Sequence, residues 1–159
     1  MTGTASQEIE RKYLVLSPPP DLDTYPHATI LQGYLVLAAD GGEVRLRRKG
    51  DRFIQTVKSG EGRVRTEVEI DLTRAQFEAL WPAVAFGTIE KIRYEIPYGV
   101  HTIELDVYHG ALEGLLTAEV EFDSVEASEA FAPPEWFGTE VTDDPRYRNR
   151  AMALSGLPA

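Results

Sequence analysis

The sequence predicts an α+β domain that is mainly β, with seven to eight short strands forming a barrel or a sandwich and a few helices attached. Three observations support this fold class. Short segments that alternate apolar and polar residues follow one another along most of the 159-residue chain. Turn residues such as GG, GD and GEG separate these segments. Two or three stretches have helical character instead. The length favours one domain, spanning residues 1–159.

The elements can be placed in order along the chain. Strands are expected at 8–15, 31–37, 44–49, 52–58, 63–70, 90–96, 101–108 and 115–122. Three prolines make 17–23 a loop, because proline cannot join a strand ladder. The run from Thr73 to Gln76 fits a capping box and predicts a helix that stops near Pro82. A short helix near 126–131, a proline-rich loop and a last helical segment at 145–154 complete the chain.

Composition excludes several classes of function. The chain has no cysteine, so neither a disulfide framework nor a thiolate metal site is available. His27, His101 and His109 do not pair at the spacing of zinc ligands. A formal net charge of −10 argues against nucleic-acid or anionic-membrane binding through a basic surface. The start of the chain lacks signal-peptide character and no apolar run reaches membrane-spanning length, so we expect a cytoplasmic protein.

The charged residues of the expected strands recur at every second position. In the opening segment QEIERKYLVL, Glu8, Glu10 and Lys12 share one face, because alternate side chains of a strand point to the same side. The same alternation places like charges on one face of later strands: Arg45 with Arg47, Glu67 with Glu69, Lys91 with Arg93, Glu104 with Asp106, and Glu119 with Glu121. Arg65 shares the face of Glu67 and Glu69, and Lys58 shares the face of Thr56 at the end of its strand.

Such alternation has an ordinary interpretation and a functional one. Ordinarily it marks half-buried strands whose polar faces meet water. Like charges side by side are unfavourable, however, unless a group of opposite sign lies between them. Metal cations would relieve the acidic strands and a polyanion the basic ones. A closed barrel of about eight strands has room for one small ligand, so its interior would suit a metal-bound polyphosphate.

An ordered series of motifs resembles a known family. EIERKYLV resembles the ExExK signature of the CYTH domain of triphosphate tunnel metalloenzymes, and the series continues through QGYL, VRLRRKG, TVKSGEGRVRTEVEI, KIRYEI, ELDVYHGALEGLLTAEVEF and VTDDPRYRNRAMA. The resemblance covers nearly the whole chain and is closest to the short bacterial members. It implies a single CYTH domain at 1–159. The implied fold is an eight-stranded antiparallel closed barrel, the triphosphate tunnel, with a few short helices outside.

The resemblance also implies three overlapping sets of site residues. Divalent metal is expected at Glu8, Glu10, Glu67, Glu69, Glu104, Asp106, Glu119 and Glu121. Phosphates are expected at Lys12, Arg45, Arg47, Lys58, Arg65, Lys91 and Arg93. Lys12, Glu67, Glu69 and Asp106 are the catalytic candidates, the last three for a second metal or for placing the attacking water. Because all the metal ligands are carboxylates, the expected ion is Mg²⁺ or Mn²⁺.

Several positions stay open at this level. Glu69, Glu104 and Arg65 could instead form ion pairs at the barrel rim. Tyr34 could reach the interior or serve packing, and Arg48 is expected to face solvent because it cannot share a face with its charged neighbours. Three arginines of the last segment read as surface or cap residues, and whether one of them closes a tunnel mouth is left open: Arg146, Arg148 and Arg150.

The expected activity is metal-dependent hydrolysis of inorganic triphosphate to pyrophosphate and phosphate, with water as the attacking group. Two alternatives keep the tunnel: a class IV adenylyl cyclase, and a thiamine or nucleoside triphosphatase. A third is a binding module for polyphosphate that catalyses nothing. The expected partner is inorganic triphosphate or another small molecule bearing a triphosphate, without nucleic acid or membrane, and a homodimer is left open.

Overall fold

The protein, as a computed structural model, is described for residues 2–7, 9–59 and 64–158. Side chains are described for residues 9–59 and 66–158. The described strands are β1 (Thr2–Gln7), β2 (Glu10–Val15), β3 (His27–Leu37), β4 (Glu43–Lys49), β5 (Arg52–Ser59), β6 (Val64–Leu72), β7 (Thr88–Tyr98), β8 (His101–His109), β9 (Leu116–Glu121) and β10 (Phe137–Glu140). The α-helices are α1 (Arg74–Leu80), α2 (Val125–Ala130) and α3 (Asn149–Ser155). Short 3-10 turns lie at Leu22–Thr24, Trp81–Ala83, Gly110–Leu112 and Pro145–Tyr147.

All the strands of the described chain belong to one antiparallel sheet. Its order is β1-β6-β5-β4-β3-β7-β8-β9-β2-β10. The eight strands expected from the sequence are confirmed, and β1 and β10 are two further strands. The capping box before α1 is confirmed as well, with Thr73 accepting from the Gln76 amide and the Gln76 side chain accepting from Thr73. None of the described helices is long and apolar enough to cross a membrane.

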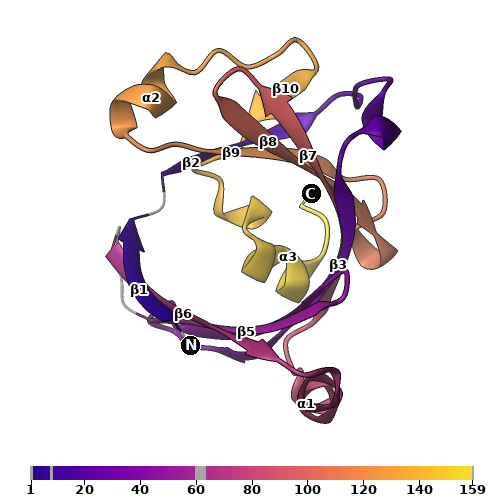
Figure 1. Ribbon diagram of the computed structural model, residues 1–159, viewed down its shortest axis with the longest axis vertical. Helices are drawn as coiled ribbons and strands as arrows, with labels where there is room; N and C mark the ends of the chain where they lie inside the picture. Colours follow the sequence, from indigo (N-terminus) through magenta and orange to yellow (C-terminus); the bar gives the residue numbers. More distant parts are fainter. Residues whose placement is uncertain (1, 8, 60–63, 159) are drawn as a thin grey trace.

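The two unexpected strands occupy the edges of the sheet. β1 pairs with β6, and β10 pairs with the free side of β2. Hydrogen-bonded closure of an eight-stranded barrel is therefore not confirmed, because β10 takes the edge of β2 that closure would use. The strands nevertheless curve into a ring in Figure 1, where β1 and β2 follow each other along the chain and β6 and β9 flank them.

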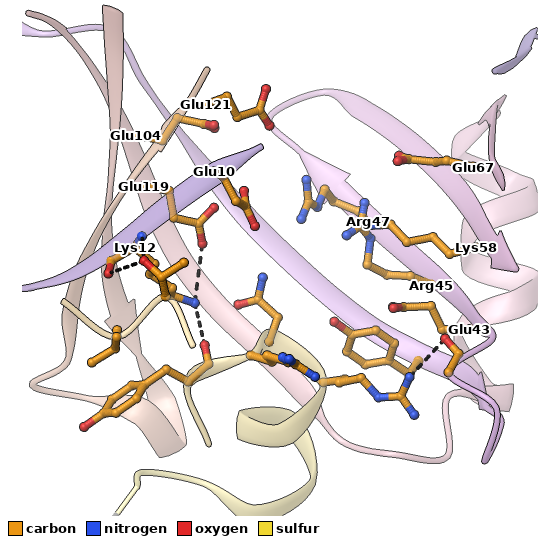
Figure 2. A pocket seen from close by; sticks show the side chains of 18 of the residues that line it. Glu10, Lys12, Glu43, Arg45, Arg47, Lys58, Glu67, Glu104, Glu119 and Glu121 are labelled. Atoms are coloured by element: carbon orange, nitrogen blue, oxygen red, sulfur yellow. Dashed lines mark hydrogen bonds and ion pairs between the residues drawn. The ribbon is translucent and has the colours of Figure 1, made fainter. Parts of the chain in front are cut away.

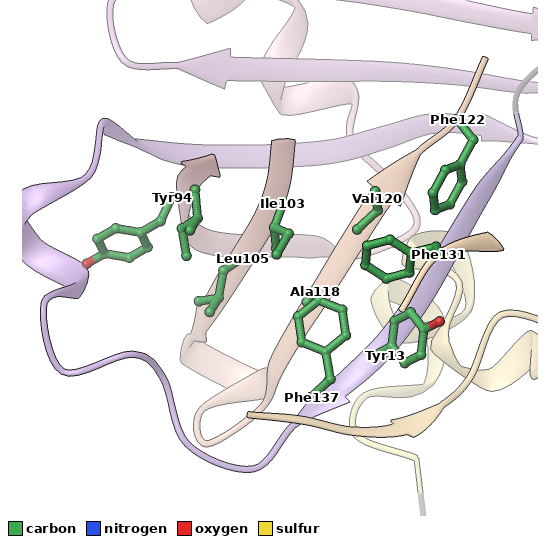
Figure 3. Packing of buried hydrophobic residues seen from close by; sticks show 10 residues of the cluster. Tyr13, Tyr94, Ile103, Leu105, Ala118, Val120, Phe122, Phe131 and Phe137 are labelled. Atoms are coloured by element: carbon green, nitrogen blue, oxygen red, sulfur yellow. The ribbon is translucent and has the colours of Figure 1, made fainter. Parts of the chain in front are cut away.

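The outward face of the sheet is apolar and is covered in two places. On one side, Ile103, Leu105 and Val120 pack beneath Phe131 and Phe137, which come from the segment after β9 (Figure 3). Trp136 packs against the same cluster. On the other side, Leu46 and Phe53 pack against Phe77 of α1, and Trp81 lies beside them. These apolar residues alternate with the charged ones, so the charged residues share the opposite, inward face.

The C-terminal helix lies inside the ring instead of outside it (Figure 1). Met152 of α3 is buried against Ile89, Tyr108 and Leu112. Ile89 has the parity of Lys91 in β7, so this cluster fills one end of the inward face. A side chain at Gly87 would meet the backbone carbonyl of Ala153, which explains a glycine where α3 approaches β7. The expectation that the helices lie outside the strands holds for α1 and α2 and is wrong for α3.

Candidate active site

The inward faces of the strands meet in one charged pocket of about 760 Å³. Figure 2 shows two sides of the pocket. Glu10, Glu104, Glu119 and Glu121 gather with Lys12 on one side, which we call the acidic wall, and Arg45, Arg47 and Lys58 lie with Glu43 and Glu67 on the other, which we call the basic wall. The pocket is lined by most of the residues singled out from the sequence: Glu10, Lys12, Arg45, Arg47, Lys58, Glu67, Glu69, Arg93, Glu104, Glu119 and Glu121. The alternation of charges therefore located the pocket. The individual roles of these residues stay predictions.

Two predicted residues lie outside this description. Glu8 falls outside the described residues, and Arg65 lies on the described backbone of β6, but its side chain is not described. The choice between a tunnel role and a rim ion pair for Arg65 thus stays open. Glu69 lines the pocket, and Glu104 both lines it and forms an ion pair with Arg93.

Lys91 and Asp106 lie beneath the pocket wall and do not line it. Both side chains are almost fully buried, and Lys91 Nζ lies 2.8 Å from Asp106 Oδ2. Arg93 donates to both oxygens of Asp106, from Nε at 2.8 Å and from Nη2 at 2.9 Å. Its remaining nitrogen, Nη1, lies 2.8 Å from Glu104 Oε2. Arg93 therefore links a buried ion pair to a carboxylate of the pocket.

This geometry gives Asp106 a different role from the one expected. Burial alone would raise its pKa, but the positive charges of Lys91 and Arg93 and their hydrogen bonds hold the pKa of Asp106 far below its ordinary value. Both of its oxygens already face cations. As arranged, Asp106 is the counter-ion of Arg93 and Lys91, because both of its oxygens contact these cations and its side chain does not line the pocket. Lys91 is likewise placed to support Arg93 and has no surface in the pocket.

The basic wall carries positive charges that the protein does not fully neutralise. Arg47 donates to Gln32 Oε1 from Nε at 2.9 Å and from Nη2 at 2.7 Å, so the acceptor of both hydrogen bonds is a neutral amide. Burial and the neighbouring charges of Arg45 and Arg93 lower the pKa of Arg47 to about 9. Arg45 donates from Nη2 to Thr56 Oγ1 at 3.3 Å, while its buried Nε has no acceptor among the described residues. Unfilled donors of this kind suit a bound anion.

Tyr34, left open by the sequence, faces the pocket. It is almost fully buried and lines the pocket between the basic residues. Burial raises the pKa of Tyr34 to about 12, so its phenol keeps its proton and can donate a hydrogen bond. Arg48 is exposed on the other face of β4 and lies over the ring of Phe53, as its parity predicted.

The acidic wall places carboxylates directly opposite one another. Glu10 of β2 is the register partner of Glu121 in β9, and Glu104 of β8 is the partner of Glu119. Like charges at directly opposed positions destabilise a sheet unless a cation lies between them. Lys12 Nζ lies 3.4 Å from Glu119 Oε1 and supplies one such cation.

The oxygen donors of this wall fit a hard divalent ion in chemical type. In the described part of the chain, no three Asp, Glu or His side chains are gathered closely enough to hold an ion as they stand. With the described residues alone, binding an ion would require the carboxylates of β2 and β9 to move closer together. Glu8, the remaining member of the opening motif, is not among the described residues.

The pocket also contains residues that sequence reasoning missed. Glu43 lines it, and extending the parity of Arg45 by one step would have found it. The turn between β3 and β4 contributes Ala39, Asp40 and Gly41. The other missed residues come from the C-terminal segment, which has no strand periodicity: Val141, Thr142, Asp144, Tyr147 and Asn149. Arg148 and Arg150 line the pocket too, so the C-terminal segment does border it. Arg150 donates to the carbonyls of Gly41 and Ala38 at 3.1 and 3.3 Å, whereas Arg146 pairs with Asp144 and does not line the pocket.

Comparison with known proteins identifies the family. No family model matches the chain. An inorganic triphosphatase from Nitrosomonas europaea is 49% identical over 151 residues, which cover 93% of this chain and 97% of the relative. One from Acetivibrio thermocellus is 36% identical over 150 residues, covering 90% of each. The chain belongs to the inorganic triphosphatase family.

Solved structures agree with this family assignment. A crystal structure of the inorganic triphosphatase NE1496 matches with a TM-score of 0.76 and 43% identity, covering 97% of this chain and 98% of that one. A putative adenylyl cyclase from Hippeastrum matches with a TM-score of 0.57 at 15% identity, over 77% of this chain and 82% of that one. At that identity the second match shows the fold alone, so it does not favour a cyclase over the triphosphatase family.

Proposed function

We propose that this protein hydrolyses inorganic triphosphate to pyrophosphate and phosphate in the charged pocket. The observation that carries the proposal is the opposition of two walls in one pocket. One wall offers arginine and lysine donors, including a buried Arg45 Nε without an acceptor among the described residues. The other sets Glu10 opposite Glu121. The named activity of relatives at 49% and 36% identity supports the same substrate.

The basic wall is suited to hold and neutralise a polyphosphate. Arg45, Arg47, Lys58 and Arg93 reach the pocket from β4, β5 and β7, and Lys12 faces them from β2. Phosphoryl transfer depends on positioning and charge neutralisation more than on covalent chemistry with the protein. Charged N–H donors aimed at phosphate oxygens supply both, and they stabilise the charge that develops on the leaving pyrophosphate.

The acidic wall is suited to hold Mg²⁺ or Mn²⁺. Glu10, Glu119 and Glu121 would be its ligands, joined by Glu104 where it is not engaged by Arg93. A divalent ion bound there supplies charge neutralisation of the phosphate oxygens and activation of water. Glu67 and Glu69 line the pocket from β6 and are the carboxylates that we assign to orienting the attacking water. Asp106 is left out of this set because its oxygens are bound to Arg93 and Lys91.

We further propose that the chain is a short bacterial CYTH protein whose strands enclose a triphosphate tunnel. The ring of strands in Figure 1 and the inward direction of the charged side chains support this proposal. The step from β1 to β2 would join the two sides of the ring through the chain itself. Because α3 fills one end, substrate would enter from the other.

A substrate panel tests the proposed function. Phosphate release is measured from inorganic triphosphate and from ATP with Mg²⁺, Mn²⁺ or Ca²⁺, and cyclic AMP is measured in parallel. Triphosphate should be cleaved faster than ATP, because its unesterified end brings more negative charge to the basic wall, and cyclic AMP should not form. Ca²⁺ should support the reaction poorly, since it prefers longer bonds and looser coordination. Cyclic AMP as the main product, with triphosphate intact, would refute the proposal in favour of a cyclase.

A further inference from the structure

The main chain of Lys12 is held by the segment that follows β10. The register of β10 against β2 shifts between Phe137 and Glu140, and the chain then leaves the ladder. The Lys12 carbonyl accepts from the Val141 amide at 2.8 Å. The Lys12 amide, which points to the same side, donates to Thr142 Oγ1 at 3.0 Å. A threonine hydroxyl thus stands where a regular sheet would supply a backbone carbonyl.

The Thr142 hydroxyl is oriented by a second hydrogen bond. Its proton goes to Glu140 Oε2 at 2.6 Å, which leaves a lone pair for the Lys12 amide. Arg11 holds Glu140 at two points, Nε to Oε2 at 2.9 Å and Nη2 to Oε1 at 2.6 Å. Arg11 Nη1 also donates to the Ser128 carbonyl at 2.8 Å. Hydrogen bonds from Arg11 lower the pKa of Glu140, so it remains an acceptor at neutral pH.

The network acts on a lysine whose side chain is confined as well. Lys12 Nζ donates to the Tyr147 carbonyl at 2.5 Å. It also lies 3.4 Å from Glu119 Oε1, and Figure 2 shows the Lys12 and Glu119 side chains pointing toward each other. Only 12% of the Lys12 side chain is exposed. Arg11, the next residue on β2, points to the opposite face, so the hydrogen bonds pass around the edge of the strand from the outer surface to the pocket.

We infer that Thr142 is a positioning residue that fixes Lys12 for the bound triphosphate, with Glu140 and Arg11 holding its hydroxyl in place. The inference rests on the proposed function, because it assigns Lys12 to the phosphates. Thr142 itself lines the pocket but acts through the Lys12 main chain, on which the direction of the ammonium depends. No strand pattern in the sequence marks Thr142, since only the path of the C-terminal segment brings it to β2.

The test compares Thr142→Val with Thr142→Ser. Valine keeps the branched shape and removes the hydroxyl, whereas serine keeps the hydroxyl. Thr142→Val should lower kcat for triphosphate by about fivefold or more, because the Lys12 amide loses its acceptor, while Thr142→Ser should stay within about twofold of wild type. Thr139→Val is the matched control on β10, because Thr139 is exposed and has no side-chain hydrogen bond among the described residues. Equal activities of the valine and serine variants would overturn the inference.

A second measurement separates positioning from a general structural role. Calorimetric titration with triphosphate should show a loss of affinity for Thr142→Val in the wild-type background and no further loss in a Lys12→Gln background, because the two residues act through one side chain. An undiminished further loss would overturn the inference. If Thr142→Val does not fold, Glu140→Gln is measured in its place. It should cause a smaller loss of triphosphate affinity, and this loss should disappear in the Lys12→Gln background. No loss of affinity in Glu140→Gln would refute the network.

The two proposals can fail separately. A wild-type protein that releases no phosphate from triphosphate refutes the proposed function. Exchange of the Lys12 amide hydrogen needs neither substrate nor turnover. Thr142→Val should speed it by about tenfold or more, and Thr142→Ser should not. Unchanged exchange in the valine variant would overturn the role of Thr142 whatever the activity of the protein.

Discussion

The β7–β8 wall and the β2–β9 wall of the pocket are built from the same kinds of charged residue and differ in how the charges are paired. Across β7 and β8, Arg93 is the register partner of Asp106, and opposite charges meet at 2.8 Å. Across β2 and β9, Glu10 is the register partner of Glu121, so like charges are opposed. The first wall buries its charges as ion pairs, whereas the second sets two carboxylates face to face at the open pocket, beside the Lys12–Glu119 ion pair.

The difference separates a structural role from a binding role. The ion pairs of Lys91, Arg93 and Asp106 are buried, so each partner depends on the others for compensation. The carboxylates of the β2–β9 wall face an open pocket, where a cation can enter and relieve them. Removing one charge should therefore have opposite effects on the two walls: instability in the first, and lost activity with retained stability in the second.

The largest expected effect is that of Asp106→Asn on stability. It leaves Lys91 and Arg93 buried without their main counter-ion, which should lower the free energy of unfolding by about 3–5 kcal/mol. Urea denaturation at neutral pH measures this loss. Asp71→Asn is the matched control, because the Arg52–Asp71 ion pair is mostly exposed, at 66% and 79%. A loss no larger than that of the control would break the distinction between the two walls.

Acid should destabilise the protein through the same residue. The pKa of Asp106 is depressed in the folded state, mainly because Lys91 and Arg93 outweigh the effect of its burial. Such a carboxylate contributes stability above its unfolded pKa of about 4, and that contribution is lost as the pH falls further toward the folded-state value. Melting temperatures below pH 4 should therefore fall less steeply for Asp106→Asn than for wild type. Parallel curves would contradict the assignment.

In the β2–β9 wall, Glu10→Gln should reduce turnover and spare the fold. Loss of this proposed metal ligand should lower phosphate release by about a hundredfold. The melting temperature should stay the same or rise, because one of two opposed carboxylates is removed. Both are measured on one preparation, by phosphate release and by thermal denaturation. Full activity would mean that the opening motif is structural in this protein.

Arg45→Ala should weaken substrate binding with a smaller effect on the fold. Its Nε is a buried donor without an acceptor among the described residues. A bound anion could accept a hydrogen bond from this nitrogen, so the side chain should matter more for binding than for folding. The loss in triphosphate affinity should be about 1.5–3 kcal/mol, the value of one charged hydrogen bond. Calorimetric titration with triphosphate measures it. Unchanged affinity would remove Arg45 from the phosphate-binding wall.

The smallest effect is expected for Arg52→Ala. The exposed ion pair with Asp71 spans 3.2 Å and lies away from the pocket residues. Its loss should change the free energy of unfolding by less than about 1 kcal/mol and leave turnover unchanged. A large loss of activity would show that charged residues outside the pocket also contribute to turnover, so the two walls alone would not explain the activity.

Much of the fold could be predicted because strand alternation is a local signal. The eight expected strands each carry it, and the same parity pointed to the pocket residues from Glu10 to Glu121. β1 and β10 escaped prediction for local reasons as well: TGTASQ has no alternating apolar residues and FGTE is only four residues long. Closure of the barrel depends on which strands pair with the two edges of β2. The sequence of a single segment does not specify this pairing.

The sequence predicted which residues face the inside of the ring, but it could not predict how deeply each one is buried there. Alternation assigns Lys91 and Asp106 to the inward face, yet it cannot show that they lie beneath the pocket wall and pair with each other. Thr142 and Arg150 reach the pocket only because the chain after β10 crosses toward it. Such residues follow from tertiary contacts, and a sequence pattern of period two or 3.6 does not mark them.

The most direct test of the account is a Mg²⁺ titration of phosphate release from inorganic triphosphate by the wild-type protein, starting from chelated protein and substrate. In the proposed mechanism, the acidic wall binds a divalent ion without which the triphosphate held by the basic wall is not hydrolysed. Phosphate release should therefore be absent without the ion and should rise to saturation as Mg²⁺ is added. Release at full rate in the presence of the chelator, unaffected by added Mg²⁺, would contradict it.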